Sequence, residues 1–290
     1  MSVPRELIAA LAVPAAAASG PGAAPARSSA RARAARLALR AGAVATAVGL
    51  WEFASARRLD LRVVTFRNVP APTEVAEAAW RLLHSPKLPL HVANSLLRVF
   101  AGFGVAAVAG VVLGLVIGRL RWAEDALLPP LEVLRPIPGV AWIPLAILMF
   151  PSSEVSMVYI TFIGALFPIL LNTIHGVEGI DHRLIASSRS LGAGSWAVFR
   201  EVVLPAALPS IFTGLAIGMG TCWFCLVTAE MIAGQYGIGY YTWESYTLQD
   251  YPDIVVGMLA IGLFGMGSSA LVKLVGRTLT PWYRSPERAP

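Results

Sequence analysis

Long apolar runs without charge alternate with short polar segments over most of the chain. Four runs match the roughly 20 apolar residues that a helix needs to cross a membrane, and they cover residues 99–118, 155–177, 202–229 and 254–272. A fifth run, 136–153, continues backwards to 127 despite Glu132 and Arg135, and the weakest run, 41–56, contains Glu52. The pattern predicts six membrane-spanning helices, at about 40–57, 90–118, 127–150, 154–177, 204–230 and 253–276.

The composition supports a membrane protein and argues against a soluble chain of two domains. Hydrophobic residues make up 56% of the 290 residues and charged residues only 14%, whereas soluble domains average about 45–50% and about 25%. The net charge of +6 comes from basic residues scattered between the apolar runs, so they form no stripe of the kind that binds nucleic acid. We therefore expect an all-α integral protein of the lipid bilayer without a nucleic-acid partner.

The distribution of Lys and Arg predicts how these helices are oriented. Cytoplasmic connections are enriched in both residues, and placing the N-terminus in the cytoplasm puts 15 of them on that side. Six lie in the opposite connection 57–87, which departs from the rule, and the segment 231–252 has none. Both termini are therefore expected in the cytoplasm.

The ends of the chain and the first outer connection lack long apolar runs. Residues 1–36 are rich in Ala, Pro, Ser and Arg, which is typical of a disordered tail, although a signal or transit peptide shares part of this bias. We expect a transmembrane domain over 37–284 and a short tail over 285–290. Pro70 and Pro72 stop any preceding helix, and Thr73 is a candidate N-cap for an interfacial helix over 74–84.

Glycines recur at a spacing that favours close helix packing. Gly110, Gly114 and Gly118 follow one another every fourth residue in the second predicted span, and Gly214 and Gly218 do so in the fifth. Small residues at this spacing let two helix backbones approach closely. The pattern predicts a helix bundle and does not indicate a function.

Prolines interrupt the third predicted span. Pro136, Pro138 and Pro144 remove backbone donors within nine residues, and proline inside a helix kinks or breaks it. Broken backbone at membrane depth survives only where protein or a water-filled cavity satisfies it. We expect Pro138, Trp142 and Pro144 to line a translocation path, with a kinked but purely structural helix as the alternative.

The connection 181–203 is polar but carries large apolar side chains. Residues 184–192 have the pattern of a short amphipathic helix ended by Gly192, and Trp196 and Phe199 lie on a second one. Apolar side chains displayed to water, such as Leu184 and Leu191, are costly unless a partner covers them. We therefore expect a partner protein at this connection.

Several residues here match the spacing of a known cytoplasmic signature: Ala186, Ser187 and Ser188, then Gly192, Val202, Leu204 and Pro205. The chain resembles the inner-membrane permeases of binding-protein-dependent ABC importers, whose signature is Glu-Ala-Ala, three residues, Gly, nine residues, Ile, one residue, Leu-Pro. Ala186 replaces the signature's Glu, so the ion pair that this Glu would make is in doubt, whereas the docking helix is not.

Three further stretches narrow the resemblance to the nitrate, sulfonate and taurine permeases. They are Ser95-Leu96-Leu97-Arg98 with Gly102-Phe103, the run Arg135-Pro136-Ile137-Pro138 with Ala141-Trp142-Ile143-Pro144-Leu145, and Ala229-Glu230-Met231 with Gly237-Ile238-Gly239-Tyr240. The resemblance covers about 40–284. It implies a type I ABC importer fold of six transmembrane helices with a cytoplasmic coupling helix, in a prokaryotic inner membrane.

The resemblance also implies partners and a cargo. Two copies of the chain would enclose the path, two ATPase subunits would bind below, and an external binding protein would deliver a small oxyanion. The residues implied in coupling to the ATPase are Leu184, Ala186, Ser187, Ser188, Arg189, Leu191, Gly192, Leu204 and Pro205. An uncharged or heterocyclic cargo is the alternative within transport, and a non-transporting membrane scaffold is the alternative outside it.

The sequence offers no route by which this chain would hydrolyse ATP. It contains no Gly-x-x-x-x-Gly-Lys-Ser/Thr pattern, which phosphate-cradling loops use. We therefore expect a transporter subunit that is not an enzyme and holds no cofactor or metal. ATP and Mg would be bound by the partner ATPase.

Charged residues inside the spans are candidates for the path, because burying charge in a membrane is costly. Arg98 would attract an anionic substrate or anchor a helix end, and Glu230 would pair with Arg98 or cap a re-entrant segment over 234–246. The Tyr- and Trp-rich segment 231–252 fits an aromatic belt or a docking surface for the binding protein.

Two cysteines raise a different possibility. Cys222 and Cys225 have the spacing of a thiol redox pair, which would indicate a membrane oxidoreductase. A reactive thiol needs a helix N-terminus or a cationic neighbour, and the run 202–229 holds no charged residue. The sequence therefore argues against redox chemistry.

Overall fold

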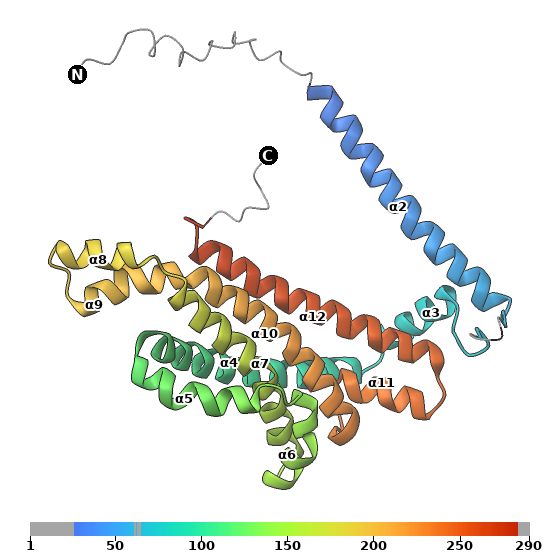
Figure 1. Ribbon diagram of the computed structural model, residues 1–290. Coiled ribbons are helices and arrows are strands. Elements are labelled where there is room, and N and C mark those ends of the chain that lie inside the picture. Colours follow the sequence, from blue (N-terminus) through green and yellow to red (C-terminus); the bar gives the residue numbers. More distant parts are fainter. Residues whose placement is uncertain (1–25, 61, 63–64, 284–290) are drawn as a thin grey trace. The chain divides into compact units, whose positions relative to one another are not determined.

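The computed structural model describes the backbone of residues 26–60, 62 and 65–283 (Figure 1). The chain divides into two units, Met1–Phe53 and Ala54–Pro290. Among the described residues there is no β-strand, and the one β-type pairing is an isolated bridge between Asp60 and Thr65. The predicted all-α membrane class is confirmed.

Residues 26–53 of helix α2 (Ala26–Ala56) make up the described part of the first unit, and the end of the helix, from Ala54 on, belongs to the second. Its stretch Ala34–Ala56 is long and apolar enough to cross a membrane. The helix begins at Ala26, within the tail predicted over 1–36, and residues 1–25 of that tail lie outside the described residues. Alanine and arginine, which fill this stretch, are among the best helix formers.

The second unit contains the remaining elements in the following order: α3 (Pro72–Leu83), α4 (Leu88–Arg119), α5 (Arg121–Leu134), the 3-10 helix η1 (Gly139–Trp142), α6 (Ile143–Met149), α7 (Ser153–Glu178), α8 (His182–Ser190), α9 (Ser195–Val198), the π-helix η2 (Phe199–Val203), α10 (Leu204–Ala233), α11 (Ile238–Thr247) and α12 (Tyr251–Leu279). Helices α4, α7, α12 and the stretch Ser195–Ala233 are each long and apolar enough to span a membrane. Short helices lie at the two ends of this bundle, α8 and α9 at one and α3 and α11 at the other (Figure 1).

The third predicted span is broken. Helix α5 and the η1–α6 segment pass the length and hydropathy test only as a pair, and they are bent by 85° at the break. The break falls between Leu134 and Gly139, where Pro136 and Pro138 lie, as the prolines predict. Pro144 does not break α6 but lies in its first turn, where a missing backbone donor costs nothing.

Helix α7 forms the centre of the bundle between α4 and α10. A Cβ at Gly110 of α4 would lie 2.9 Å from Ile169 Cγ2, and one at Gly114 would lie 2.6 Å from Thr173 Cβ. On α10, a Cβ at Gly218 would lie 2.9 Å from Cγ1 of the same Ile169. The glycines therefore let α4 and α10 approach α7 from two sides, which is how helices associate where lipid removes the hydrophobic drive.

The predicted interfacial helix over 74–84 corresponds to α3, with a different cap. The helix starts at Pro72, and the Glu74 side chain accepts a hydrogen bond from the backbone N–H of Ala71 at 2.9 Å. Thr73 therefore lies inside the helix, and the prediction that it is the N-cap is wrong. The helix starts at Pro72 and not at residue 74 because proline, whose φ is already helical, is favoured at the first helical position.

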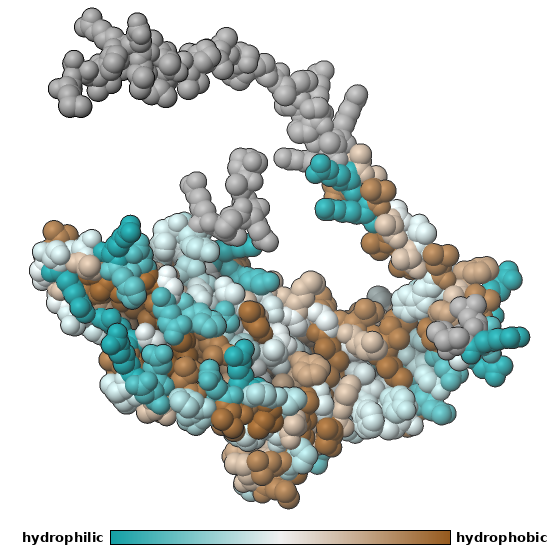
Figure 2. Space-filling view, viewed as in Figure 1, coloured by the Kyte–Doolittle hydropathy of each residue, from teal (hydrophilic) through white to brown (hydrophobic). Residues whose placement is uncertain are grey.

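Much of the bundle surface is apolar. Leu97 and Val108 of α4 and Leu263 and Met266 of α12 are each more than 60% exposed. On the face that Figure 2 shows, apolar areas lie between hydrophilic residues gathered near α8 and α9 and near α3. An apolar waist between polar ends is what a lipid bilayer requires.

Candidate functional site

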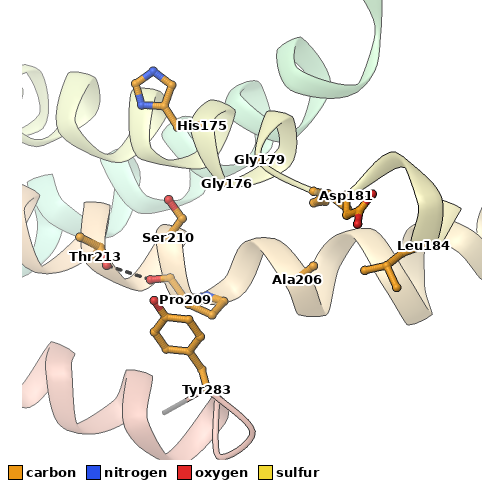
Figure 3. A pocket seen from close by; sticks show the side chains of 11 residues that line it. His175, Gly176, Gly179, Asp181, Leu184, Ala206, Pro209, Ser210, Thr213 and Tyr283 are labelled. Carbon is orange, nitrogen blue, oxygen red and sulfur yellow. Dashed lines mark hydrogen bonds between the residues drawn. The ribbon is translucent and has the colours of Figure 1, made fainter. Parts of the chain in front are cut away.

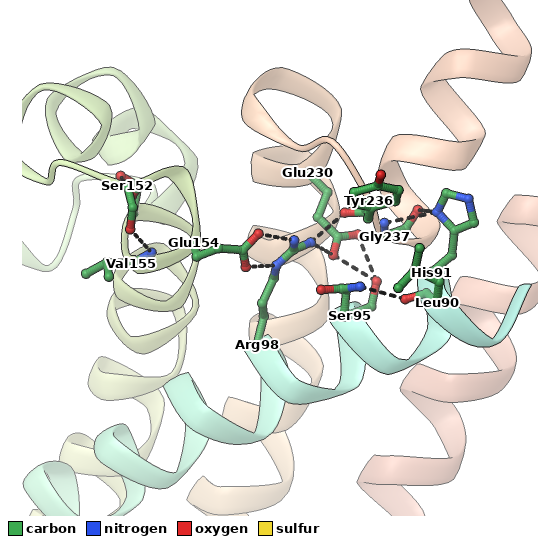
Figure 4. Close-up of polar contacts among 12 residues, drawn as sticks. Leu90, His91, Ser95, Arg98, Ser152, Glu154, Val155, Glu230, Tyr236 and Gly237 are labelled. Atoms are coloured by element: carbon green, nitrogen blue, oxygen red, sulfur yellow. Dashed lines mark hydrogen bonds and ion pairs between the residues drawn. The ribbon is translucent and has the colours of Figure 1, made fainter. Parts of the chain in front are cut away.

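A buried ion-pair network lies at the α11 end of the bundle, centred on Arg98 of α4 (Figure 4). The Arg98 guanidinium donates to both oxygens of Glu154, with Nε–Oε2 at 2.7 Å and Nη2–Oε1 at 2.6 Å. Its Nη1 donates to Glu230 Oε1 at 2.8 Å and to the Tyr236 carbonyl at 2.6 Å. The side chain is only 3% exposed, so a buried guanidinium with four hydrogen bonds ties α4, α7 and α10 together.

Glu230 is the most enclosed member of this network. Its side chain is completely buried, and besides Arg98 it accepts hydrogen bonds from the Ser95 hydroxyl at 2.8 and 3.0 Å and from the Gly239 N–H at 2.9 Å. A buried carboxylate is tolerable only when charge and hydrogen bonds offset its desolvation. Glu230 has both, and the Gly239 contact places its charge at the N-terminus of α11.

Two further residues of α4 fix the start of α11. The Ser95 hydroxyl accepts the Ile238 N–H at 2.8 Å, and His91 Nδ1 lies 3.1 Å from the Gly237 nitrogen and 3.0 Å from its oxygen. Gly237 adopts φ +133°, a left-handed conformation that side chains avoid. A Cβ at Gly237 would also collide with the Glu230 carboxylate, so only glycine fits this turn.

The structure confirms one prediction about these charges and adds a residue. Glu230 both pairs with Arg98 and caps α11, which are the two roles predicted for it. Arg98 is enclosed by its partners instead of facing an open vestibule. Glu154, which the sequence analysis missed, follows the N-cap Ser152 at the start of α7. Its signal was a carboxylate at the edge of an apolar run, at the same end of the bundle as Arg98.

The proline-rich break packs against the bundle core. A Cβ at Gly139 of η1 would lie 2.7 Å from Cys225 Sγ of α10, while Pro138 and Pro144 are exposed. The broken backbone is satisfied locally, because Ala141 N donates to the Pro138 carbonyl at 2.9 Å. The Trp142 indole N–H is buried without a hydrogen-bond partner among the described residues.

The connection 181–203 folds as two short helices that present apolar side chains to solvent. Asp181 caps α8 by accepting the Arg183 N–H at 2.8 Å, and Gly192 follows the helix with φ +84°, as glycine after a helix often does. Leu191 is 89% exposed and Trp196 is 70% exposed. The sequence predicts a helix over 184–192, and the observed α8 (His182–Ser190) begins and ends two residues earlier, with Gly192 just beyond its end.

The second half of this connection joins directly to α10. Trp196 stacks on Phe199 with ring centroids 5.6 Å apart, and Phe199 is half-buried instead of exposed. Val198 and Val203 are buried in a small apolar cluster with residues of α7 and α10. The segment α9–η2 therefore anchors the exposed α8 to a membrane helix.

Comparison with known proteins identifies the family. Residues 109–285 match the family model described as binding-protein-dependent transport system inner membrane component. The chain belongs to this family of transport permeases. The match includes α8, α9 and the whole of α10, so the exposed connection lies within the shared region.

Relatives of known name support the same family. The permease is 36% identical over 208 residues to the nitrate import permease protein NrtB of Synechocystis, covering 69% of this chain and 76% of the relative. It is 34% identical over 235 residues to the Escherichia coli protein SsuC, named as an aliphatic sulfonates transport permease, covering 81% and 88%. The similarity to the nitrate and sulfonate permeases that the motifs indicate is thus confirmed.

A cavity of about 450 Å³ lies in the permease where α8 leaves α7 (Figure 3). Its lining includes His175 of α7, Ser210 and Thr213 of α10, and Tyr283 beyond α12. The Ser210 hydroxyl donates to the Asn172 carbonyl at 2.7 Å, which joins the walls contributed by α7 and α10. The start of α8 therefore borders this cavity.

The two cysteines of the permease are packing residues. Cys222 and Cys225 are buried and unbridged within α10, and Cys222 Sγ contacts the Thr161 carbonyl at 3.5 Å. Among the described residues, no group of three or more His, Cys, Asp or Glu side chains could hold a metal ion.

Proposed function

We propose that this permease is the membrane subunit of an ATP-driven, binding-protein-dependent importer for a small oxyanion. The observation that carries the proposal is the exposed α8–α9 connection, whose Leu191 and Trp196 face solvent although they are large and apolar. Such a surface on a membrane transport protein needs a protein partner. An ATPase subunit is that partner in this proposal, and it would bind the ATP and Mg.

Coupling would run from α8 into the bundle. In this proposal α8 seats in a cleft of the ATPase, so that closure of the nucleotide-bound dimer moves α8 together with α9 and η2. The π-helix η2 leads directly into α10 at Leu204 and Pro205, and α10 packs along α7 through Gly214 and Gly218. Tilting α10 would therefore also displace α7. Single π-helical turns often mark functional positions in helices.

The residues that contact the ATPase would be those that α8 exposes. Ala186, Ser187, Arg189 and Leu191 are exposed, while Ser188 is half-buried. The Ser188 hydroxyl donates to the Leu184 carbonyl at 2.8 Å, which turns it back onto its own helix. Ser188 would therefore support the helix, and the exposed residues would make the contacts.

Two copies of the chain would enclose the path, with both termini in the cytoplasm. The excess of Lys and Arg at the α8 end supports this orientation, and the exposed apolar side chains of α4 and α12 are available to lipid or to a second copy. The α3 and α11 end would face the external binding protein. The path would pass the broken segment that contains Pro138, Trp142 and Pro144.

The Arg98 network would shape the outer end of the path without binding cargo directly. Its guanidinium already makes four hydrogen bonds to protein acceptors, so four of its five donors are in use. We therefore assign Arg98 and Glu230 to holding α4, α7, α10 and the start of α11 in register.

The cargo class follows from the relatives and not from a site in this chain. The relatives are named for nitrate and for aliphatic sulfonates, which are both small oxyanions. Reconstituted proteoliposomes with the partner ATPase and binding protein test this proposal. We expect ATP-dependent accumulation of labelled nitrate or an alkanesulfonate in preference to a neutral solute, whereas preferential uptake of the neutral solute would contradict it.

A further inference from the structure

A basic cavity at the α3 end of the bundle has no role in the function proposed above. It has a volume of about 520 Å³ and lies among the end of α2, the segment before α3 and the start of α12. Its polar lining comes from Ser55, Arg58, Arg67, Asn68, Glu74 and Tyr251. This is also the connection with more basic residues than an outer connection normally carries.

The two arginines of this cavity are available to a ligand. Arg58 and Arg67 are both exposed, and within the part of the chain that the structure describes neither guanidinium has an ion-pair partner. The carboxylate in the lining, Glu74, accepts the Ala71 N–H with Oε2 at 2.9 Å. The cavity lining therefore contains two guanidinium groups and one carboxylate, and that carboxylate already accepts a hydrogen bond at the start of α3. The net charge of the lining is positive.

A buried hydroxyl without a partner lines the same cavity. Ser55 is only 6% exposed, and its Oγ has no hydrogen-bond partner among the described residues. Leaving a buried polar group unsatisfied is costly, so such a group in a cavity lining indicates a ligand. The adjacent carbonyls are already occupied, because Arg58 N donates to Ser55 O at 3.0 Å and Leu59 N to Ala54 O at 3.1 Å.

The backbone adds to the positive potential. Asn68 lies just before the N-terminus of α3, and Tyr251 is the first residue of α12, so the cavity borders the positive ends of two helix dipoles. Arg58 adopts φ +47°, a conformation that costs a long side chain energy. This conformation belongs to the end of α2, because the bonds from Arg58 N to Ser55 O and from Leu59 N to Ala54 O form a Schellman motif.

We infer that this cavity is an oxyanion-binding site, in which Arg58 and Arg67 hold a phosphate-type group and the Ser55 hydroxyl donates to one of its oxygens. Guanidinium groups bind phosphate and sulfonate oxygens through paired, charge-assisted hydrogen bonds. The oxyanion could belong to a free small anion or to the headgroup of an anionic phospholipid. The site stands apart from the proposed import activity, and it requires neither the ATPase nor the binding protein.

Binding to the purified permease tests this inference. Inorganic phosphate is titrated by calorimetry at constant ionic strength, and retention of phosphatidylglycerol against phosphatidylcholine is measured by native mass spectrometry. The test variant is Arg58→Gln/Arg67→Gln, and the matched control is Arg62→Gln/Lys87→Gln, which removes two positive charges from the same connection outside the cavity. We expect the test variant to lose about tenfold or more in affinity and the control to stay close to the wild type.

A milder variant keeps the test valid if the double variant does not fold. Ser55→Ala removes no charge and is expected to weaken binding about two- to tenfold. Binding of phosphate alone would identify a free anion as the ligand, and selective retention of phosphatidylglycerol would identify a lipid headgroup. Binding of neither probe, or an equal loss in the control variant, would overturn the inference.

Discussion

Arg98 Nη1 lies 2.8 Å from Glu230 Oε1, and these two side chains are 3% and 0% exposed. They come from α4 and α10, which both pack on α7, and Arg98 also binds Glu154 at the start of α7. The pair thus joins the three central helices at one end of the bundle. Because the start of α11 also binds Glu230 and Ser95, the position of this short helix depends on the same pair.

Removing Glu230 is expected to destabilise the permease strongly. Glu230→Ala leaves a buried guanidinium with one charged partner, Glu154, that is itself 60% exposed, and breaking a buried pair in this way costs about 3–5 kcal/mol. Thermal unfolding in detergent measures the effect, with Glu132→Ala on the exposed face of α5 as the control. Equal melting temperatures for the two variants would show that the pair carries no stability.

Position 237 is expected to tolerate no residue other than glycine. Gly237→Ala would force a Cβ into the Glu230 carboxylate at φ +133°, and the backbone strain alone costs about 1–3 kcal/mol. The control is Gly262→Ala, because a Cβ there meets no atom within 4 Å. We expect Gly237→Ala to lower the melting temperature and to expose α11 to proteolysis, while Gly262→Ala leaves both unchanged. Wild-type behaviour of Gly237→Ala would refute the proposed fit.

Two glycines of α4 allow a matched test of helix packing. At Gly114 a Cβ would lie 2.6 Å from Thr173 Cβ, whereas at Gly104 nothing lies within 4 Å. Gly114→Leu is therefore expected to separate α4 from α7 at a cost of about 1–3 kcal/mol or more, and Gly104→Leu is expected to be neutral. The yield of monodisperse protein and its melting temperature measure the difference. If Gly104→Leu were less stable than Gly114→Leu, the face of α4 that contains Gly114 would not be the one that packs on α7.

Coupling is expected to depend on the turn after α8. Gly192 adopts φ +84°, which proline cannot adopt because its ring fixes φ near −65°. Gly194 has φ −70°, so Gly194→Pro fits and serves as the control. We expect Gly192→Pro to abolish ATP-dependent uptake in proteoliposomes while the permease remains folded, and Gly194→Pro to retain uptake. Transport by Gly192→Pro at the wild-type rate would place coupling elsewhere.

Features that depend on local pattern could be predicted from the sequence. Apolar runs predict the spanning helices because length and hydropathy alone decide insertion into a bilayer. Gly192 predicts the end of α8, and Pro136 and Pro138 predict the break before η1, because both act through their own backbone. The pairing of Arg98 with Glu230 was predicted because two opposite charges at one membrane depth have few other partners.

Features that depend on packing could not be predicted in the same way. Glu154 joins Arg98 only because α4 and α7 lie side by side, and its position at the edge of an apolar run does not by itself identify Arg98 as its partner. The conformation of Gly237 follows from the position of the Glu230 carboxylate, which is likewise a tertiary property. The early start of α2 and the Ala71 cap of α3 show the uncertainty of helix boundaries, where neighbouring residues compete as first turn and cap.

The central claim is that α8 couples this permease to an ATPase, and the mass of the assembled complex tests it most directly. The permease is co-expressed with the partner ATPase subunit, and its native mass is measured in detergent with and without residues 184–191. We predict a complex of two permease chains and two ATPase subunits that forms only when these residues are present. A permease that never binds the ATPase, or a complex that forms equally well without these residues, would contradict the claim.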